Sequence, residues 1–434
     1  MKKVLLAVVL LVSSQLSAWA GDKAVVADLQ SGSKVQAAVS ALGAKVLRNI
    51  PGTSLYLLKV PVVPGSQSYP SLGITSVELD SAVTLRPSPI SWGILKIQGS
   101  QLAEWYAQQP ALKLIQADKA VAIARGRGIV VADLNARVDV GHKALIGHLT
   151  AGYDFVAERE ISDAVLNQSS ASFLDQSSAA FLDQSSAAFL DQSSAAFLDQ
   201  SSAAFLDQSS ASFLDQSSAS FLDAGNPAHG HGTLCAALIA AVAPDSMIMP
   251  LRVFDDKGNA DLFSIVKAIH YAVTNGADVI NMSFGLESQS PAVKKAIAFA
   301  IEQGVTVVAS AGNNDSRVKQ YPAAYNDVLA AAATDLQDKK ASFSNYGDAV
   351  FVTAPGVNII SAYPGGYYAV ASGTSFSAPL VAGEAALLRS NSRRHAASRA
   401  IAKGAVDIDA KNPKYDGKLG AGRIDILNSL QIVN

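Results

Sequence analysis

The feature that most constrains the fold of this sequence is a regular alternation of short apolar runs with longer amphipathic segments after residue 108. The apolar runs are rich in Val, Ile and Ala, whereas segments 262–274 and 291–303 have the length and spacing of helices. Alternation of this kind predicts an α/β fold with a parallel sheet flanked by helices, because parallel strands are joined by helical crossovers. The expected strands are 129–132, 247–253, 279–282, 305–309 and 328–333.

The first twenty residues have the pattern of an export signal. Lys2 and Lys3 form a basic start, residues 4–12 are apolar, and Ala18-Trp19-Ala20 is a small-x-small cleavage site. A membrane anchor is the alternative, but this apolar run is much shorter than the about 20 residues that span a bilayer. The sequence therefore predicts a signal peptide at 1–20 and a secreted protein, extracellular or, if the source has an outer membrane, periplasmic. We expect no membrane attachment once the signal is removed.

Composition limits the other functional classes. Of 434 residues, 49% are hydrophobic and 16% are charged, which favours a compact enzyme of two or three units over a disordered chain. The net charge of −2 and the lack of a long basic run argue against a nucleic-acid partner. The single cysteine, Cys235, allows no internal disulfide.

Residues 21–88 predict a small α+β unit ahead of the main domain. The expected elements are strands at 24–29, 54–60 and 74–85 and a helix at 33–42. Its position between a signal peptide and a larger domain predicts a propeptide. A poorly patterned connector, 89–107, leads to the main domain, 108–434.

One segment is foreign to the alternating pattern. Between residues 168 and 223 the octapeptide Gln-Ser-Ser-Ala-(Ala/Ser)-Phe-Leu-Asp repeats without a gap, and it contains no Gly or Pro. We interpret it as an expanded insertion in a permissive surface loop, because long surface insertions add little loop-closure entropy. A dedicated binding arm is the alternative.

Three side chains follow the expected strands or begin apolar helices, where a catalytic site of this architecture would lie. Ser375 opens the apolar helix after Gly373-Thr374, His231 opens another, and Asp133 directly follows the strand 129–132. Together they could supply a nucleophile, its base and a carboxylate that orients the base. Asp139 is the alternative acid, and we prefer Asp133 for its position at the strand end. A metal site at His229 and His231 lacks a third ligand, so we expect no metal and no cofactor.

The chain order Asp, His, Ser, with Gly373-Thr374-Ser375 and His231-Gly232-Thr233, resembles the subtilisin-like serine proteases of the subtilase family. Further stretches resemble the same family, namely 281–285, 310–313, 343–347, 354–356 and 420–425. Together these stretches cover most of residues 108–434.

The resemblance implies a secreted serine endopeptidase with Asp133, His231 and Ser375 as its catalytic triad. It also implies that Asn313 donates a hydrogen bond to the oxyanion and that substrate binds as an extended strand. The implied substrate-binding residues are Gly258, Ala260, Ser283 and Gly285. The expected partners are peptide or protein substrates and the chain's own propeptide, an inhibitor and folding aid, on a monomeric enzyme of broad or apolar preference.

The sequence departs from the family directly after Asp133. The usual Ser/Thr-Gly is replaced by Leu134-Asn135-Ala136-Arg137, and the next acid, Asp139, comes two residues late. This departure keeps a second hypothesis open, that of a catalytically impaired homologue acting as a peptide-binding or repeat-mediated adhesive protein. The N-terminal unit also departs, since it offers no clear second helix.

Overall fold

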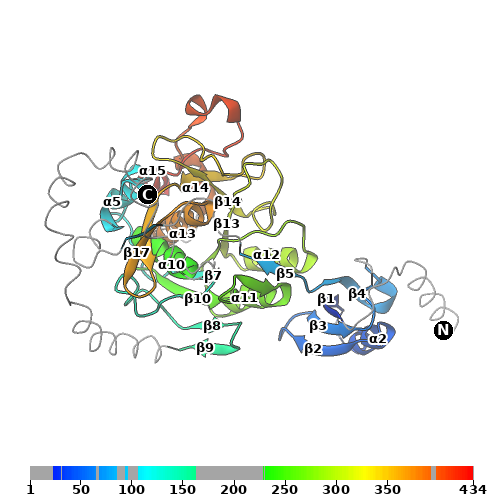
Figure 1. Cartoon of the computed structure of the whole chain (residues 1–434). Coiled ribbons are helices and arrows are strands. Elements are labelled where there is room, and N and C mark those ends of the chain that lie inside the picture. The colour runs from blue at the N-terminus through cyan, green and yellow to red at the C-terminus, as the bar shows by residue number, and fades with distance from the viewer. Residues whose placement is uncertain are drawn as a thin grey trace.

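The computed structural model describes residues 23–433 except 31, 65–67, 86–92, 96–105, 163–227, 229 and 392–396 (Figure 1). The predicted signal peptide 1–20, the octapeptide repeats 168–223, His229 and most of the connector 89–107 lie outside the described residues. The domain boundaries drawn from the sequence therefore stay predictions.

An eight-stranded sheet forms the centre of the molecule, in the order β15-β14-β13-β12-β7-β10-β8-β9. Its pairings are parallel except that β8 and β9 are antiparallel. This confirms the predicted α/β fold with a parallel sheet and adds one antiparallel edge pair that was not expected. The strands are β7 Val130–Asn135, β8 Gly152–Asp154, β9 Arg159–Ile161, β10 Met247–Arg252, β12 Val279–Met282, β13 Thr306–Ser310, β14 Leu329–Thr334 and β15 Val352–Pro355.

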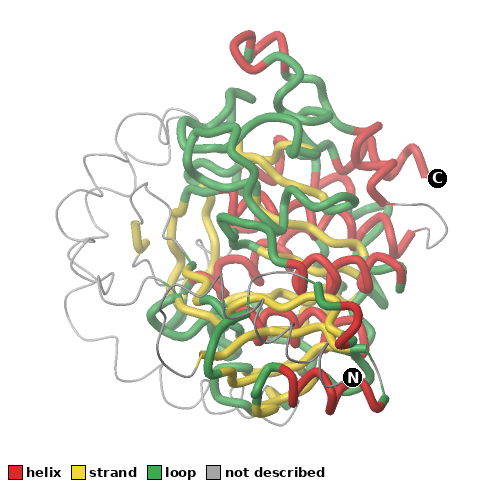
Figure 2. The backbone as a smooth tube through the Cα atoms, turned by 90° about the vertical axis from the view of Figure 1, so that its right-hand side faces the viewer, coloured by secondary structure: helices red, strands yellow, loops and turns green. Residues whose placement is uncertain are grey.

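Both faces of this sheet are covered by helices (Figure 2). Because successive strand residues point to opposite faces, Val131 packs in one core cluster and Ala132 in the other. The cluster of Val131 contains α10 His231–Val242 and α13 Thr374–Asn391. The cluster of Ala132 contains α11 Leu262–Thr274 and α12 Pro291–Glu302. Strands buried on both faces explain the continuous apolar runs of the sequence.

Smaller elements close the edges of the domain. A three-stranded antiparallel sheet has the order β16-β17-β6, and short helices pack near the C-terminus. None of the helices in the described ranges is long and apolar enough to cross a membrane. These elements are β6 Gly93–Leu95, β16 Ile359–Tyr363, β17 Tyr367–Ala371, α4 Pro110–Leu114, α5 Ala117–Ala120, α14 Ala397–Gly404, η2 Asp409–Lys411, η3 Pro413–Tyr415 and α15 Ile426–Val433.

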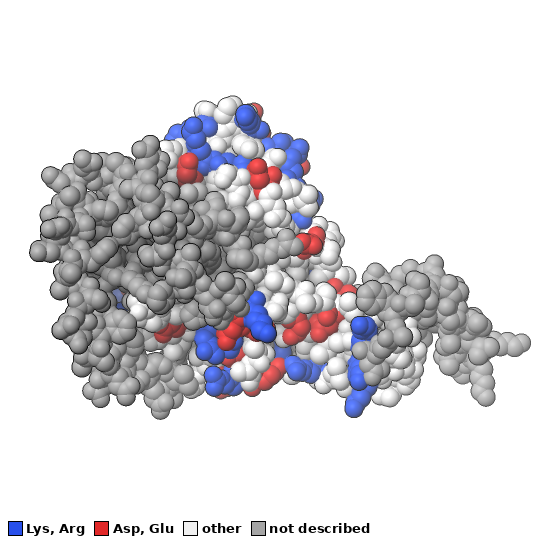
Figure 3. Space-filling model, viewed as in Figure 1, with Lys and Arg blue, Asp and Glu red and all other residues white. Residues whose placement is uncertain are grey.

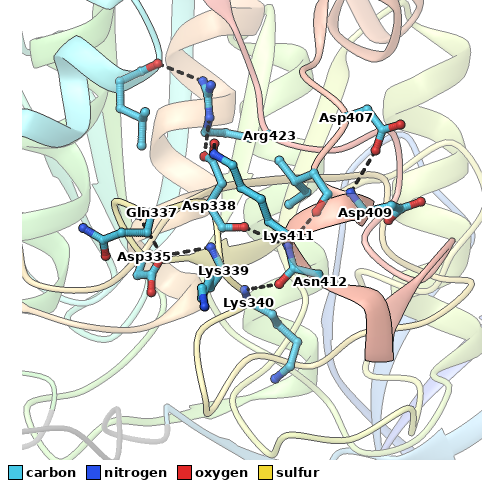
Figure 4. A network of polar contacts seen from close by, with 12 residues as sticks. Asp335, Gln337, Asp338, Lys339, Lys340, Asp407, Asp409, Lys411, Asn412 and Arg423 are labelled. Atoms are coloured by element: carbon cyan, nitrogen blue, oxygen red, sulfur yellow. Dashed lines mark hydrogen bonds and ion pairs between the residues drawn. The ribbon is translucent and has the colours of Figure 1, made fainter.

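The C-terminal segment is fixed by a buried carboxylate, shown in Figure 4. Asp338 accepts hydrogen bonds from Arg423 Nε at 2.6 Å and from Lys411 Nζ at 2.8 Å. Its backbone carbonyl accepts a third from Nδ2 of Asn412, at 2.8 Å. The two cations neutralise the buried carboxylate, as a charged group taken out of water requires. They thereby hold two parts of the C-terminal segment, at residues 411 and 423, against the loop that carries Asp338.

The N-terminal unit is an antiparallel sheet in the order β2-β3-β1-β4, covered by the helix α2. Two details differ from the sequence prediction. Strand β2 was not expected, because its residues are all exposed and show no apolar alternation. The expected strand 74–85 is divided, and its second part, β5, leaves this sheet. The elements are β1 Lys23–Leu29, α2 Ser33–Ala41, β2 Lys45–Asn49, β3 Leu55–Val60, η1 Pro70–Leu72, β4 Ile74–Leu79 and β5 Ala82–Thr84.

Carboxylates of the N-terminal unit dock on two helices of the main domain. Glu78 accepts hydrogen bonds from the Ala292 N–H at 2.8 Å and from the Ser290 hydroxyl at 3.1 Å, at the start of α12. Asp80 accepts one from the Phe263 N–H at 3.0 Å, at the start of α11. Helix N-termini favour negative charge, so these contacts orient the unit. In Figure 3, basic and acidic side chains lie among one another along the lower edge of the molecule.

The buried Glu384 of α13 should make the stability of the protein fall with rising pH. Burial raises its pKa from 4.5 to about 8, so the unfolded chain loses this proton at lower pH than the folded chain does. Between these values the free energy of unfolding should therefore decrease, by up to about 1.4 kcal/mol per pH unit. Glu384→Gln should remove this loss, so its melting-temperature gain over wild type should grow from pH 4.5 to 8.

The exposed Glu302→Gln serves as the matched control and should show no such trend. A gain for Glu384→Gln that is the same at both pH values would contradict the assignment of a neutral, buried Glu384.

Candidate active site

The imidazole of His231 is placed by an unusually close approach of helix α10 to the end of strand β7. A Cβ atom on Gly232 would lie 2.5 Å from the carbonyl oxygen of Ala136 and 2.6 Å from that of Arg137. Only glycine therefore lets α10 begin against this loop. The approach brings the ring of His231, which is 3% exposed, to the last residue of β7.

Ser375 lies in the first turn of α13, as the sequence predicted. Its hydroxyl donates to the carbonyl oxygen of Ser283 at 3.2 Å, and the Ser283 hydroxyl donates to the carbonyl oxygen of Ser375 at 2.9 Å. The ring of His231 lies 5.7 Å, between centroids, from that of the adjacent Phe376. The fold therefore brings the predicted nucleophile and the predicted base into one buried site.

The third predicted member of the triad does not touch the imidazole. Nδ1 of His231 lies 2.7 Å from Oδ1 of Asn135, and Nδ2 of Asn135 lies 3.3 Å from each carboxylate oxygen of Asp133. This geometry corrects the expectation that Asp133 orients the imidazole directly. The expectation placed the strand end at residue 132, whereas β7 continues to Asn135. Residues 133 and 135 share one face of the strand, so the later one reaches the helix.

Burial shifts the pKa of Asp133 upward and the pKa of His231 downward, in each case toward the neutral form. Burial raises the pKa of Asp133 to about 7, although hydrogen bonds from Asn281 and Asn135 act in the opposite direction. Burial lowers the pKa of His231 to about 4. Asn281 donates from Nδ2 to Asp133 at 2.8 Å. The imidazole is therefore neutral at physiological pH, as a general base must be.

The carboxylate of the alternative acid, Asp139, bonds to backbone N–H groups and not to the imidazole. Its carboxylate accepts from the backbone N–H of Gly141 at 3.1 Å and of Gly365 at 2.8 Å. Asp139 therefore stabilises the loop after β7 and does not orient the imidazole. The two-residue delay of Asp139 is a sequence signal that could have indicated Asn135, because it moves the matching position from 133 to 135.

Asn313 lies beside the start of α13, where an oxyanion donor is expected. Its Oδ1 accepts from the N–H and from the hydroxyl of Thr374, each at 2.9 Å. These two bonds fix the orientation of the amide and aim Nδ2 away from Thr374. Asn313 and Ser375 line the same pocket.

The chain's own strand β5 lies in the groove predicted for substrate. It pairs antiparallel with β11 Asn259–Asp261, with Val83 opposite Ala260. The N–H of Leu85 then donates to the carbonyl oxygen of Gly258 at 2.7 Å. The predicted residues Gly258 and Ala260 thus hold an extended strand whose end points toward Ser375.

The other side of the groove opens into a pocket of about 180 Å³ beside Ser375. The side chain of Gln320 reaches Gly285 and Gly312, two glycines that line this pocket. Its Oε1 lies 2.1 Å from where a Cβ would stand on Gly312 and 2.7 Å from where one would stand on Gly285. The pocket is therefore narrowed by a polar amide. Its lining is Thr84, Leu85, Ser283, Phe284, Gly285, Glu287, Ser310, Gly312, Asn313, Asn314, Gln320 and Ser375.

Two further kinds of functional group were considered near the site, a reactive thiol and a set of metal ligands. Sγ of Cys235 lies 3.8 Å from Nδ1 of His231, and burial, followed by the charge of Asp133, raises its pKa. A buried thiol with a raised pKa is a poor nucleophile. Across the described ranges there is no group of three or more His, Cys, Asp or Glu residues placed to hold a metal ion.

A parallel sheet with a serine and a histidine at two helix N-termini, an asparagine beside the serine and a strand-binding groove defines the subtilisin-like serine peptidases. The sequence pattern of the Subtilase family matches residues 126–422, and the chain belongs to this family.

Curated relatives agree with this assignment. The chain is 38% identical over 213 residues to thermitase of Thermoactinomyces vulgaris, a match covering 47% of this chain and 75% of thermitase. It is 43% identical over 177 residues to the thermophilic serine proteinase of Bacillus sp. strain AK1, covering 38% of this chain but only 44% of that protein.

Two solved structures share this fold, but their sequence identity to this chain is only 23% and 24%, so the comparison concerns the fold and nothing more specific. Fervidolysin of Fervidobacterium pennivorans, described as a keratinolytic enzyme related to subtilisin, superimposes with a TM-score of 0.68 at 23% identity. That alignment covers 96% of this chain and 62% of fervidolysin. The prenylagaramide maturation protease PagA aligns with a TM-score of 0.52 at 24% identity, covering 74% of this chain and 98% of PagA.

Proposed function

We propose that this chain is a secreted serine endopeptidase that hydrolyses peptide bonds through an acyl-enzyme on Ser375. The observation that supports this most directly is the position of Ser375 and Asn313 in one pocket at the end of a groove that holds an extended strand. A peptide held in this way would present its carbonyl to both side chains. Secretion is proposed from the signal-like pattern of residues 1–20.

The proposed reaction is acyl transfer in two halves. Oγ of Ser375 attacks the substrate carbonyl and passes its proton to Nε2 of His231, while Asn313 Nδ2 and the helix N-terminus stabilise the oxyanion. The imidazolium then gives this proton to the leaving amine as the C–N bond breaks. Water repeats the sequence on the acyl-enzyme, which releases the second product and restores the Ser375 hydroxyl.

The N-terminal unit is proposed to be an inhibitory propeptide. Its strand β5 occupies the groove that substrate would use, and its carboxylates Glu78 and Asp80 dock on the starts of α12 and α11. An incoming peptide has to displace β5 before it can pair with β11. The unit would therefore block the site until it is cut and released.

The second candidate function is a catalytically impaired homologue that binds peptides, alone or through the repeats. The observation that favours it is Asn135 beside the imidazole, where the family's triad calls for an acid. In a serine-protease triad, Asn in place of the acid lowers turnover by about 10⁴ when it selects the wrong imidazole tautomer.

Labelling with a fluorophosphonate tests the two candidates against each other. The purified chain, before and after removal of the N-terminal unit, is incubated with the reagent and the modified peptide is mapped by mass spectrometry. Label on Ser375 only after removal is expected, because β5 covers the site in the full chain. Ser375→Ala is the control. No label on Ser375 in the processed protein would contradict the peptidase.

Replacement of Asn313 should slow the chemical step selectively. Asn313→Ala is expected to lower kcat by about a hundred- to a thousand-fold, the loss found on removing one such donor in this family, with KM nearly unchanged. The reason is that the amide meets a full negative charge only in the transition state. Steady-state kinetics on a short chromogenic peptide measure both constants, and an unchanged kcat would remove Asn313 from the oxyanion site.

Gln320 should limit the size of the side chain accepted next to the scissile bond. Two peptides are compared, one with Phe and one with Ala at the residue next to the scissile bond. Gln320→Gly is expected to raise the ratio of their kcat/KM values, Phe over Ala, by about ten-fold, because the change opens the space between Gly285 and Gly312. Competition between the two peptides gives the ratio. Asn314→Ala, an exposed change on the same pocket, is the control. An unchanged ratio in Gln320→Gly would exclude this role and favour the broad or apolar preference.

A further inference from the structure

We infer that Asp133 and Asn135 act together as positioning residues. Asp133 holds the amide of Asn135 with its carbonyl oxygen toward Nδ1 of His231, and this contact keeps the imidazole in the tautomer that can accept the Ser375 proton. The inference rests on the proposed function for its catalytic consequence. The arrangement of the three side chains can be tested without activity.

Two independent contacts fix the orientation of the Asn135 amide. Its Oδ1 accepts from the N–H of Ala136 at 2.9 Å, and its Nδ2 faces both carboxylate oxygens of Asp133 at 3.3 Å. A flipped amide would set NH₂ against the Ala136 N–H and its oxygen against the carboxylate. Both contacts would then be repulsive, so the observed orientation is the one that the surroundings select.

This orientation decides which imidazole nitrogen carries the proton. Oδ1 of Asn135 can only accept, and it lies 2.7 Å from Nδ1 of His231, so Nδ1 must donate. The lone pair of the neutral ring is then on Nε2, the nitrogen that a general base needs. An asparagine at this position usually costs activity because its NH₂ faces the ring and reverses the tautomer. Asp133 prevents that reversal.

Asp133 is itself held from the neighbouring strand. Nδ2 of Asn281 donates to Asp133 Oδ1 at 2.8 Å and to the Ser283 hydroxyl at 3.0 Å. The Ser283 hydroxyl in turn donates to the carbonyl of Ser375. The positioning group and the nucleophile are thus parts of one buried hydrogen-bond network, which makes their separation a fixed property of β7 and β12.

Four variants of the full chain separate orientation from charge and from packing. Asp133→Leu removes the acceptor that holds the amide, and Asp133→Asn keeps one acceptor oxygen without the charge. Asp133→Leu combined with Asn135→Asp restores an acceptor beside the ring. Asp139→Asn is the matched control, because among the described residues its carboxylate bonds to the backbone N–H groups of Gly141 and Gly365 and to no part of the imidazole.

The direct readout is the ¹⁵N chemical shifts of the His231 ring in protein labelled at histidine, assigned by comparison with His231→Gln. Wild type, Asp133→Asn, the double variant and Asp139→Asn are expected to show protonated Nδ1 and bare Nε2. Asp133→Leu should shift the tautomer ratio toward Nε2–H by about ten- to a hundred-fold. In Asp133→Leu freed of its N-terminal unit, kcat should fall in proportion to the lost fraction of the Nδ1–H tautomer, while KM stays within about two-fold of wild type.

The inference fails if wild type shows Nε2–H, or if Asp133→Leu leaves the ratio unchanged. It also fails if the double variant does not recover the Nδ1–H form, since Asp133 would then act only through packing. Failure of the peptidase proposal gives a different result: Ser375 stays unlabelled although the ring carries its proton on Nδ1.

Discussion

The structure depends on one close approach, that of the first turn of α10 to the loop after β7. No side chain separates Gly232 from the carbonyl oxygens of Ala136 and Arg137, so His231 comes within hydrogen-bond distance of the last residue of the strand. The same helix packs against α13, which carries Ser375. A small shift of α10 would therefore separate the base from its positioning groups and from the nucleophile together, and this coupling makes Gly232 as important to the site as the polar residues.

A second constraint is that the groove needs a strand. β11 has an unpaired edge unless a peptide or β5 lies along it, and exposed edge groups favour pairing. The N-terminal unit satisfies this edge with its own residues, and Glu78 and Asp80 fix it to the helices beneath. One interaction therefore explains the inhibition proposed for the unit and the extended conformation proposed for substrate. It also explains why the expected strand 74–85 is divided, because its last residues pair with another sheet.

The acid of the triad marks the limit of what the sequence pattern could predict. Strand alternation places residues 133 and 135 on one face and cannot choose between them, since both point toward the helix that carries His231. The choice depends on where β7 ends and on how far α10 advances along it. The structure assigns the contact to Asn135 and leaves Asp133 one side chain away, a division of roles that chain order alone does not contain.

The sequence by itself determined the parallel sheet, the helices that cover it, and the positions of His231 and Ser375 at helix starts, because apolar periodicity and local motifs depend on neighbouring residues. It also predicted the N-terminal α+β unit, although not strand β2, whose exposed residues carry no alternating pattern. Only the tertiary structure decided that Asn135 faces the imidazole, that Gln320 narrows the pocket, and that β5 fills the groove. Each of these depends on distances of a few ångströms between segments far apart in the chain, and such distances are set by packing.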